Sequence, residues 1–453
     1  MQGNGMASAK QLALPLVKPG DEPVAGNREA SHSVQPSPWM ARVLSRDNLN
    51  RALKQVRRNK GAPGIDGMTV DELPDYLRQH WPEIRQQLLQ QTYRPKPVRR
   101  VTIPKANGGS RPLGIPTVLD RFIQQAIAQV VQQDWEPRFH PHSYGFRPGR
   151  SAHQAVRYGQ HCAREGRNWV VDLDLEAFFD RVNHDRLMAR LKRHTPDRPM
   201  LRLINRYLKA GVQIDNRKAP TPEGVPQGGP LSPVLANVVL DELDWELERR
   251  NLKFARYADD CQIYVGSHRA GERVMVSLTR FIEDSLRLTV NTRKSAVDRP
   301  WNRSFLGFTL SRKGQRLKVA DKAIRKLKTQ IRILSRRTRG HSLSQVIADL
   351  KETLLGWKAY FDEAEVLSPL RDLDKWIRRR MRSYVWKQWG RKGYRELRKR
   401  GVSVRLAWNT AKSAHGPWRL SHSPALRQAL PARLFRSYGL PELAVRKRVE
   451  SSH

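Results

Sequence analysis

Aspartates at two separate places in the chain have the spacing expected of a divalent-metal site. Asp174 ends the short apolar run 169–174, a pattern typical of a buried strand that delivers a carboxylate to a cleft. Asp259 and Asp260 lie within 254–265 between two runs of β-forming residues, so we expect both at a hairpin tip. A few carboxylates from separate strands suffice for Mg²⁺ when substrate phosphates complete its shell. Two such ions, about 3.5 to 4 Å apart, support in-line attack of a hydroxyl on a phosphate.

Each of these signals also has an ordinary structural explanation. An Asp-Asp pair at a hairpin tip is most often only a turn, because Asp is favoured there. Asp172 lies two residues before Asp174 on the expected strand, and side chains two apart share a face. Asp180 is a further acidic residue nearby. Periodicity therefore does not choose between Asp172 and Asp174.

A second set of polar residues is expected on a short hairpin over residues 98–115. Its strands are predicted at 101–103 and 111–115, with the turn at Asn107-Gly108-Gly109. The hairpin places Lys105 and Arg111 on one ribbon. A solvated basic surface is the alternative, because any single Lys of so basic a chain is usually exposed.

Helices are expected to surround these strands. Apolar residues recur at helical spacing from near Trp39 up to the glycine-rich loop 61–67, and a second helix is expected through about Gln91. Thr117, with Asp120 three residues later, resembles a helix cap that precedes an apolar, buried stripe.

A further helix is expected from Ser232, as its N-cap, to about Arg250. Beyond Ala320 the chain changes to long basic helices with interleaved aromatic residues. The sequence therefore predicts an α+β catalytic part followed by a separate helical binding module.

The charge of the chain indicates a polyanionic partner. Eighty-four Lys and Arg residues stand against 43 Asp and Glu residues, a formal net charge of +41, and phosphate groups neutralise such an excess. No apolar run of about eighteen residues is present to span a membrane. The only cysteines, Cys162 and Cys261, exclude a disulfide framework and a four-cysteine zinc site, so we expect a reducing compartment.

Several segments identify a family when they are taken together. Residues 256–260 (Arg-Tyr-Ala-Asp-Asp) resemble the Tyr-X-Asp-Asp box of reverse transcriptases, and residues 171–180 resemble their first catalytic strand. Residues 225–233 (Val-Pro-Gln-Gly-Gly-Pro-Leu-Ser-Pro) are similar to the family's Gln-Gly motif. The finer resemblance is to group II intron reverse transcriptases, and it rests on residues 59–67, 111–116, 143–148 and 305–308.

That resemblance covers the chain from about residue 40 to its end and implies a right-hand polymerase fold. The fingers and palm would be α+β, followed by an all-α thumb or maturase module. Asp174, Asp259 and Asp260, with the backbone carbonyl of Leu175, are implied as ligands of two Mg²⁺ ions, for which Mn²⁺ would substitute.

The resemblance also implies nucleotide contacts. Lys105 and Arg111 match residues that hold the triphosphate, and Gln227 matches a residue of the nucleotide pocket. Lys294 belongs to a later palm motif near the active site. Phe179 matches the ring beneath the sugar, which leaves no room for a 2′-hydroxyl; packing into the core is the alternative for Phe179 and the preferred interpretation for Phe178.

Composition and the resemblance together divide the chain into five parts. Residues 1–38 are expected to be a disordered leader, 39–97 an N-terminal extension with an RNA-contacting loop, 98–315 the fingers and palm, 316–390 the helical thumb and 391–453 a basic nucleic-acid-binding region. The zinc-supported endonuclease domain of many relatives is not expected, since no cysteine follows Cys261.

The basic helical part is the expected RNA-binding surface. Residues 376–405 hold twelve Lys or Arg and a single acid, Glu396, with aromatic residues between them. Basic groups follow phosphates while aromatic rings stack on bases. Residues 354–361 (Leu-Leu-Gly-Trp-Lys-Ala-Tyr-Phe) resemble the family's signature for this region, and a helix-packing face is the alternative interpretation, which can hold in part. The residues expected to contact RNA are Arg378, Arg379, Arg380, Arg382, Lys387, Arg391 and Lys392.

The sequence thus predicts an RNA-directed DNA polymerase that binds its group II intron RNA, assists its splicing and copies it into DNA during retrohoming. Its expected partners are that RNA, an RNA template with a DNA primer, target DNA and deoxynucleoside triphosphates, with no membrane, in the bacterial cytoplasm. Two alternatives stay open: a free-standing relative in host defence or DNA repair, and an RNA-binding maturase without polymerase activity.

Overall fold

Two compact units divide the chain in the computed structural model, which describes residues 35–104, 110–215 and 217–445. Unit 1 comprises the residues up to Ala155 together with Val170–Val297. Unit 2 comprises Val156–Trp169 together with the residues from Asp298 onward. The predicted leader, 1–38, lies almost wholly outside the described residues.

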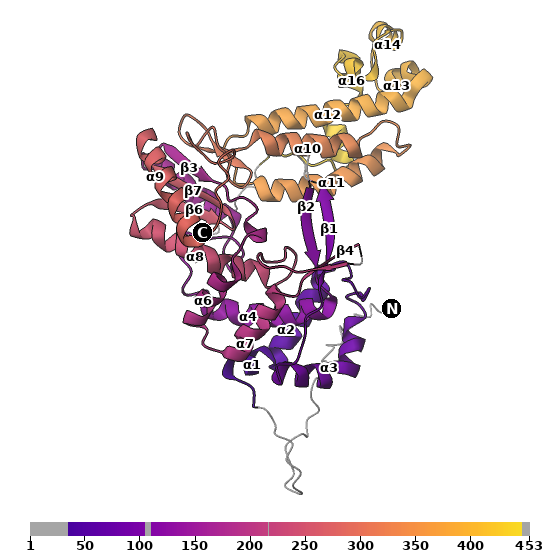
Figure 1. Cartoon of the computed structure of the whole chain (residues 1–453). Helices are drawn as coiled ribbons and strands as arrows, with labels where there is room; N and C mark the ends of the chain where they lie inside the picture. The colour runs from indigo at the N-terminus through magenta and orange to yellow at the C-terminus, as the bar shows by residue number, and fades with distance from the viewer. Residues whose placement is uncertain (1–34, 105–109, 216, 446–453) are drawn as a thin grey trace, which may run out of the picture. The chain divides into compact units, whose positions relative to one another are not determined.

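Helices form most of the mass of unit 1. They are α1 (Pro38–Val43), α2 (Arg46–Asn59), α3 (Leu73–Leu89), α4 (Val118–Trp135), α6 (His184–His194), α7 (Arg198–Leu208), α8 (Ser232–Arg249) and α9 (His268–Phe281). α1 packs against α2, α4 and α7, and α2 packs along α4 (Figure 1). α5 (Ala152–Arg164) crosses the border between the units.

Two N-caps were predicted from the sequence, at Thr117 and at Ser232, and the structure bears out only the first. The cap at Thr117 is confirmed: its hydroxyl accepts the backbone N–H of Asp120 at 3.1 Å, and the apolar stripe of α4 is buried. The predicted cap at Ser232 is wrong, because Leu231 takes the cap position and Ser232 is already helical. The Ser232 hydroxyl instead donates to the carbonyl of Pro226 at 2.6 Å and ties the helix to the loop before it.

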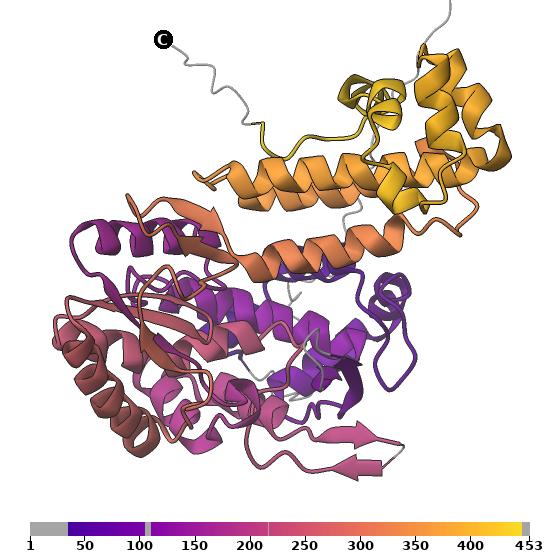
Figure 2. The same ribbon diagram turned by 90° about the horizontal axis from the view of Figure 1, so that it is seen from above.

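One sheet of unit 1 contains the predicted hairpin. β1 (Val98–Pro104) and β2 (Ser110–Ile115) pair antiparallel, with Arg99 opposite Ile115 and Ile103 opposite Arg111. β1 also pairs parallel with β4 (Val212–Ile214), which forms a second hairpin with β5 (Arg217–Ala219). This second hairpin stands out from the body of unit 1 (Figure 2). The sheet order is β2-β1-β4-β5.

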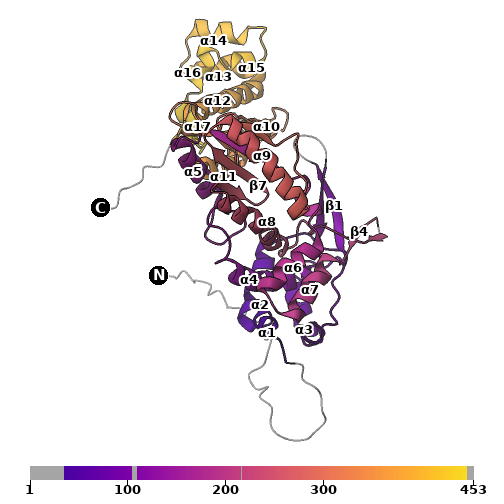
Figure 3. The same cartoon turned by 60° about the vertical axis from the view of Figure 1, so that its left-hand side comes forward.

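The other four-stranded sheet has the order β6-β7-β3-β8. Its strands are β3 (Trp169–Leu173), β6 (Lys253–Tyr257), β7 (Asp260–Val265) and β8 (Ala296–Asp298). Apolar side chains of α8 and α9 cover it, and Figure 3 shows α9 running along the sheet beside β7. β6 and β7 are the two strands that the sequence predicts around the Asp-Asp pair.

Unit 2 begins with a small sheet and continues as helices. β9 (Phe308–Leu310) and β10 (Leu317–Val319) pair antiparallel. Figure 1 shows the three long helices α10 (Asp321–Leu334), α11 (Leu343–Phe361) and α12 (Ser368–Trp389) packed together. Shorter helices follow: α13 (Gly393–Lys399), α14 (Val404–Ala411), α15 (Pro417–Leu420), α16 (Pro424–Ala429) and α17 (Ala432–Ser437).

Two family-like segments, residues 305–308 and 354–361, contact each other inside unit 2. Gly307 adopts φ +83°, and a Cβ on it would lie 3.1 Å from the ring of Phe361. The hydroxyl of Tyr360 donates to the carbonyl of Leu306 at 2.8 Å, and the rings of Phe308 and Phe361 are 5.0 Å apart. This face of α11 therefore packs against protein, as the packing interpretation of residues 354–361 predicts.

The α+β class with a helical second part is confirmed. α10 starts at Asp321, directly after the position where the sequence changes character. Among the described residues, no helix is long and apolar enough to cross a membrane.

Candidate active site

β3 and β7 are neighbours in one sheet, and their ends carry the aspartates predicted to bind metal. Asp174 directly follows β3, Asp259 lies in the turn between β6 and β7, and Asp260 begins β7. The negative charges of Asp259 and Asp174 both act on the carboxyl group of Asp260. The fold thus gathers these carboxylates at one end of the sheet, although about eighty residues separate them in sequence.

The ionised form of the Asp260 carboxyl group is disfavoured by its surroundings. Loss of solvent, followed by the negative charges of Asp259, Asp172 and Asp174, raises its pKa to about 6, while Lys294 lowers it. Asp260 also keeps an exposed surface, so a cation can approach it from solvent. Excess negative charge of this kind is what a bound cation relieves.

The end of β3 is fixed by the segment before β8. The backbone N–H of Asp174 donates to the hydroxyl of Ser295 at 3.0 Å, and the N–H of Asn291 donates to the Asp174 carbonyl at 2.8 Å. The ammonium group of Lys294 lies 3.1 Å from the Asp174 carboxylate. Lys294 therefore sits beside the acidic group, as predicted.

The predicted fourth ligand, the carbonyl of Leu175, is left out of the local strand pairing. Leu175 forms a bridge with Val290, but the two hydrogen bonds of that bridge use the carbonyl of Asp174 and the N–H of Glu176. This is the non-hydrogen-bonded type of antiparallel pair. The bridge holds Leu175 in place and does not use its carbonyl oxygen.

Asp172 and Asp174 differ in their surroundings. Both are half-buried on the same face of β3, as their spacing predicts. Asp172 accepts a hydrogen bond from the side-chain amide of Gln262 at 3.3 Å, within the sheet. Asp174 lies beyond the strand end, beside Lys294. This position suits Asp174 better for a ligand that approaches from solvent.

These donors fit Mg²⁺ only as an incomplete set. Within the described ranges, no group of three or more His, Cys, Asp or Glu side chains converges as a ready metal site. Mg²⁺ commonly binds through one or two carboxylates and completes its shell with water and substrate phosphates. Oxygen donors, excess negative charge and an open side are consistent with that mode of binding.

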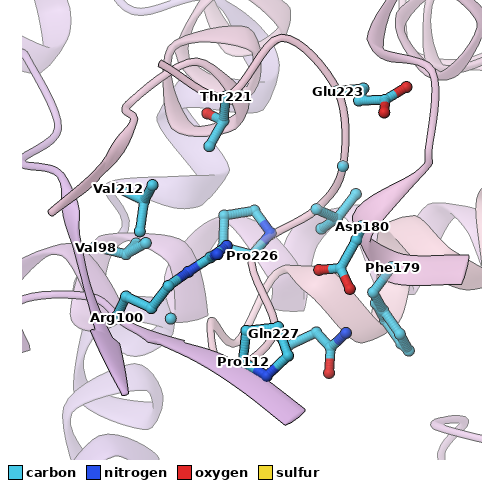
Figure 4. Close-up of a pocket in the computed structure, with 13 residues that line it drawn as sticks. Val98, Arg100, Pro112, Phe179, Asp180, Val212, Thr221, Glu223, Pro226 and Gln227 are labelled. Atoms are coloured by element: carbon cyan, nitrogen blue, oxygen red, sulfur yellow. The ribbon is translucent and has the colours of Figure 1, made fainter. Parts of the chain in front are cut away.

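A cavity of about 330 Å³ is lined by residues of β1 and β2, by Phe179 and Asp180, and by the Gln-Gly segment. Phe179, Asp180 and Gln227 line one side of it, and Arg100 and Val98 lie opposite them (Figure 4). The cavity is open to solvent and mixes polar and apolar groups, as small-molecule sites do.

Backbone hydrogen bonds hold the walls of this cavity together. The N–H of Val225 donates to the carbonyl of Phe179 at 2.6 Å, and the N–H of Gly114 donates to the carbonyl of Gln227 at 2.8 Å. At Gly228, with φ +126°, a Cβ would lie 2.5 Å from the Gly114 carbonyl oxygen, so this position requires glycine. The Gln-Gly segment is thereby tied to strand β2.

The two adjacent phenylalanines have different environments. Their rings are 5.1 Å apart and nearly perpendicular. Phe178 is 2% exposed and Phe179 is 9% exposed, and Phe179 is the one that lines the cavity. Lys105 lies outside the described residues. For Arg111 the structure places only the backbone, in β2 opposite Ile103.

The residues that support the Asp-Asp turn were not among those expected from the sequence. Arg256 is fully buried and forms an ion pair with Asp244, Nη2 to Oδ2 2.5 Å. Further hydrogen bonds link Arg256 to Ser143 and Asn237. A signal was present, because Arg256 is a charged residue inside a short run of buried-strand residues and such a charge needs a partner.

The residues expected to contact RNA in unit 2 fall into two groups. Lys387, Arg391 and Lys392 are exposed. The other four are half-buried and contact the protein through their side chains: Arg378 with Glu442, Arg379 with the ring of Trp418, Arg380 with Ser335, and Arg382 with the carbonyl of Leu430. Burial, with Arg427 and Arg378, lowers the pKa of Arg382 to about 10.

We expect divalent-metal binding to weaken as the pH falls through 6. With its pKa near 6, Asp260 is ionised at pH 7.5 and mostly protonated at pH 5, so an ion must displace a proton there. The affinity for Mn²⁺, measured by electron paramagnetic resonance, should drop roughly tenfold between these pH values. The variant Asp260→Asn should bind weakly at both, and an unchanged wild-type affinity at pH 5 would contradict this assignment.

Comparison with known proteins agrees with the geometry. Residues 103–310 match the family model for reverse transcriptase (RNA-dependent DNA polymerase). Residues 324–402 match the model for the group II intron maturase-specific domain. The first match contains both aspartate-bearing strands, and the second contains α11, α12 and most of α10.

Individual relatives include protein YkfC of Escherichia coli, 34% identical over 310 residues, 59% of this chain and 81% of YkfC. The group II intron-encoded protein LtrA of Lactococcus lactis subsp. cremoris is 38% identical over 217 residues, 47% of this chain and 36% of LtrA. The match thus spans only about a third of LtrA.

Among solved structures, a chain of a partial Cas6-RT-Cas1–Cas2 complex aligns with 26% identity and a TM-score of 0.35, over 54% of this chain and 42% of that one. The family models and the long match to YkfC lead to one conclusion: this chain belongs to the reverse transcriptases, RNA-directed DNA polymerases, that carry a group II intron maturase-specific domain.

Proposed function

We propose that the protein copies its group II intron RNA into DNA during retrohoming and assists the splicing of that RNA. The observation that carries the proposal is the position of Asp174, Asp259 and Asp260 at one end of the β7–β3 pair, within a reverse transcriptase domain followed by a maturase-specific domain. The sequence alternatives, a free-standing polymerase and a maturase without polymerase activity, have no better support.

Reverse transcription requires a divalent metal, and we propose two Mg²⁺ ions, for which Mn²⁺ substitutes. Asp174, Asp259 and Asp260, with the Leu175 carbonyl, are the groups that would hold them. The ions would supply positive charge where negative charge develops on the attacking 3′-hydroxyl and the leaving oxygen. The sheet's contribution is to hold the carboxylates in place before substrate arrives.

The cavity lined by Phe179 and Gln227 suits the sugar and base of a deoxynucleoside triphosphate. Phe179 would pack against the sugar, and Gln227 would contact the nucleotide from the Gln-Gly segment. Lys294, 3.1 Å from Asp174, would neutralise charge next to the metal ligands and reach the substrate. Lys105 and Arg111, on the predicted hairpin, would hold the triphosphate.

Nucleic acid is the partner class that the maturase-specific domain and the net charge of +41 indicate. The specific partners we propose are the intron RNA, an RNA template with a DNA primer, and target DNA, in the cytoplasm. We also propose the predicted division of roles: RNA contact by the loop in 39–97, polymerisation by 98–315, and nucleic-acid binding by 316–390 and 391–453.

Removal of single carboxylates tests the polymerase assignment. Asp259→Ala and Asp260→Ala should each lower extension of a DNA primer on an RNA template by roughly a hundredfold or more, because each removes negative charge from the metal site. RNA binding, measured by filter retention, should be unchanged. Asp185→Ala, an exposed aspartate on α6, is the matched control. Wild-type extension by Asp259→Ala would refute the proposal.

Selection against ribonucleotides should depend on Phe179. Truncation to Ala removes the ring that excludes a 2′-hydroxyl but no carboxylate, so Phe179→Ala should raise the ratio of ribonucleotide to deoxynucleotide incorporation by about tenfold or more. Phe178→Ala should leave that ratio unchanged and instead cost about 3 to 5 kcal/mol of stability. Single-nucleotide incorporation kinetics measure the ratio, and relaxation by Phe178→Ala alone would show that the wrong ring was assigned.

RNA binding by unit 2 should depend on its exposed cations. The triple replacement of Lys387, Arg391 and Lys392 by Ala should reduce the slope of log affinity against log salt concentration by about 2, because phosphate contacts are lost. Arg380→Ala and Arg382→Ala should mainly lower the melting temperature, since both side chains make internal hydrogen bonds. An unchanged salt slope in the triple variant would exclude these exposed residues as contacts.

A further inference from the structure

The guanidinium group of Arg256 donates hydrogen bonds from every one of its nitrogens. Nε and Nη2 donate to the carboxylate of Asp244 at 2.6 and 2.5 Å, and Nη2 also donates to the hydroxyl of Ser143 at 2.7 Å. Nη1 donates to the side-chain oxygen of Asn237 at 3.1 Å and to the backbone carbonyl of Ala258 at 2.9 Å. The five N–H donors of a guanidinium group are thus all satisfied in a fully buried setting.

The bond to Ala258 bears on the aspartate turn. Ala258 adopts φ +57°, a left-handed conformation that costs a non-glycine residue free energy and must be held by its surroundings. Its carbonyl belongs to the peptide that leads into Asp259. By fixing this carbonyl, Arg256 limits rotation of the backbone directly before the Asp-Asp pair.

A second contact is made to the same residue, at its backbone nitrogen. A Cβ on Gly145 would lie 2.3 Å from the backbone nitrogen of Ala258, so this glycine touches the turn and leaves no room for a methyl group. The carbonyl of Gly145 accepts the side-chain amide of Asn237 at 2.8 Å, and Asn237 in turn accepts from Arg256. The backbone of Tyr144 also pairs with that of Arg256, N to O 2.8 Å.

We propose that Arg256 and Gly145 are positioning residues for the catalytic aspartates. Arg256 holds the carbonyl oxygen of Ala258 and Gly145 packs against its backbone nitrogen, and together they set the direction in which Asp259 and Asp260 present their carboxylates to metal. This inference rests on the proposed polymerase function and adds to it a support that lies behind the metal ligands. Supports of this kind typically change metal affinity by about 10- to 100-fold.

Stability alone does not account for the arrangement. A buried ion pair is often no more stabilising than well-packed apolar residues, because two charges must be removed from water. β6 and β7 already pair along their length, from Lys253 opposite Tyr264 to Tyr257 opposite Asp260. Ala258 and Asp259 are the two turn residues that this ladder does not pair, and the contacts from Arg256 and Gly145 converge on the first of them.

Paired glycine substitutions test the positioning role of Gly145. Gly145→Ala places a methyl group against Ala258, whereas a Cβ on Gly266, directly after β7, meets no atom within 4 Å. Neither glycine has a positive φ, so Ala is compatible with the backbone of both. We expect Gly145→Ala to weaken Mn²⁺ binding about tenfold, with the Mg²⁺ concentration for half-maximal extension rising in parallel. Gly266→Ala should match wild type.

Arg256→Lys tests the role of Arg256, because lysine keeps the charge beside Asp244 but cannot donate to Ala258, Asn237 and Ser143 together. The same rise in metal requirement is expected, with the KM for deoxynucleotides at saturating Mg²⁺ changed less than about threefold. RNA binding should be as in wild type. Loss of RNA binding in step with activity in both variants would overturn the inference, since that would reflect general unfolding.

Wild-type metal dependence in both Gly145→Ala and Arg256→Lys would overturn it as well. In that case, if Asp259→Ala is inactive, the proposed polymerase function is still supported and only the positioning role is excluded. Full activity of Asp259→Ala would remove the function itself, so the two failures are distinguishable.

Discussion

Repulsion among the carboxylates at the end of β3 and β7 is the constraint on which the rest of the site depends, because the surrounding structure must hold these like charges together. Loss of solvent and the negative charges of the neighbouring aspartates raise the pKa of Asp260, which shows that the ionised form of this carboxyl group is disfavoured here. The sheet resists this repulsion by fixing the backbones from which the carboxylates project. Ser295 and Asn291 hold Asp174 through main-chain hydrogen bonds, and the Lys294 ammonium group offsets part of the charge. A backbone fixed in this way would let a cation bind without rearrangement of the protein.

Much of the fold follows from local sequence. The Thr117 hydroxyl and the apolar stripe behind it determine the start and the buried face of α4, because both signals act within one or two turns of helix. The Ser232 cap failed for an equally local reason. Its hydroxyl had a competing acceptor in the carbonyl of Pro226, which depends on the path of the preceding loop. Strand order is another matter: nothing within β7 or β3 specifies that they become neighbours, since that depends on contacts far apart in the chain.

The candidate site shows the same division between local and distant causes. The aspartates could be predicted because each lies in a short, continuous sequence motif, and because carboxylates suit metal binding. Arg256 lies in the same motif, yet its importance depends on Asp244, Asn237 and Ser143, which come from a helix and a distant loop. A charge within an apolar strand indicates that a partner exists but does not identify it. The role of Gly145 could not be predicted from the sequence, because it consists in lacking a side chain where the backbone of Ala258 passes.

Composition also could not separate the two uses of arginine in unit 2. The run 376–405 has the charge of an RNA-binding surface, but half-buried side chains such as Arg380 and Arg382 make internal hydrogen bonds to Ser335 and Leu430. Helical spacing explains the split. Residues 378–382 belong to the well-packed part of α12, where neighbours such as Ile377 and Met381 are buried, whereas Arg391 and Lys392 lie past its end. Long cationic side chains next to a core can hold helices together through their stems and heads. Lys387 in the last turn of α12, and Arg391 and Lys392 past its end, are exposed and keep their charged groups in solvent, so position along the helix, and not the number of cations, separates the two uses.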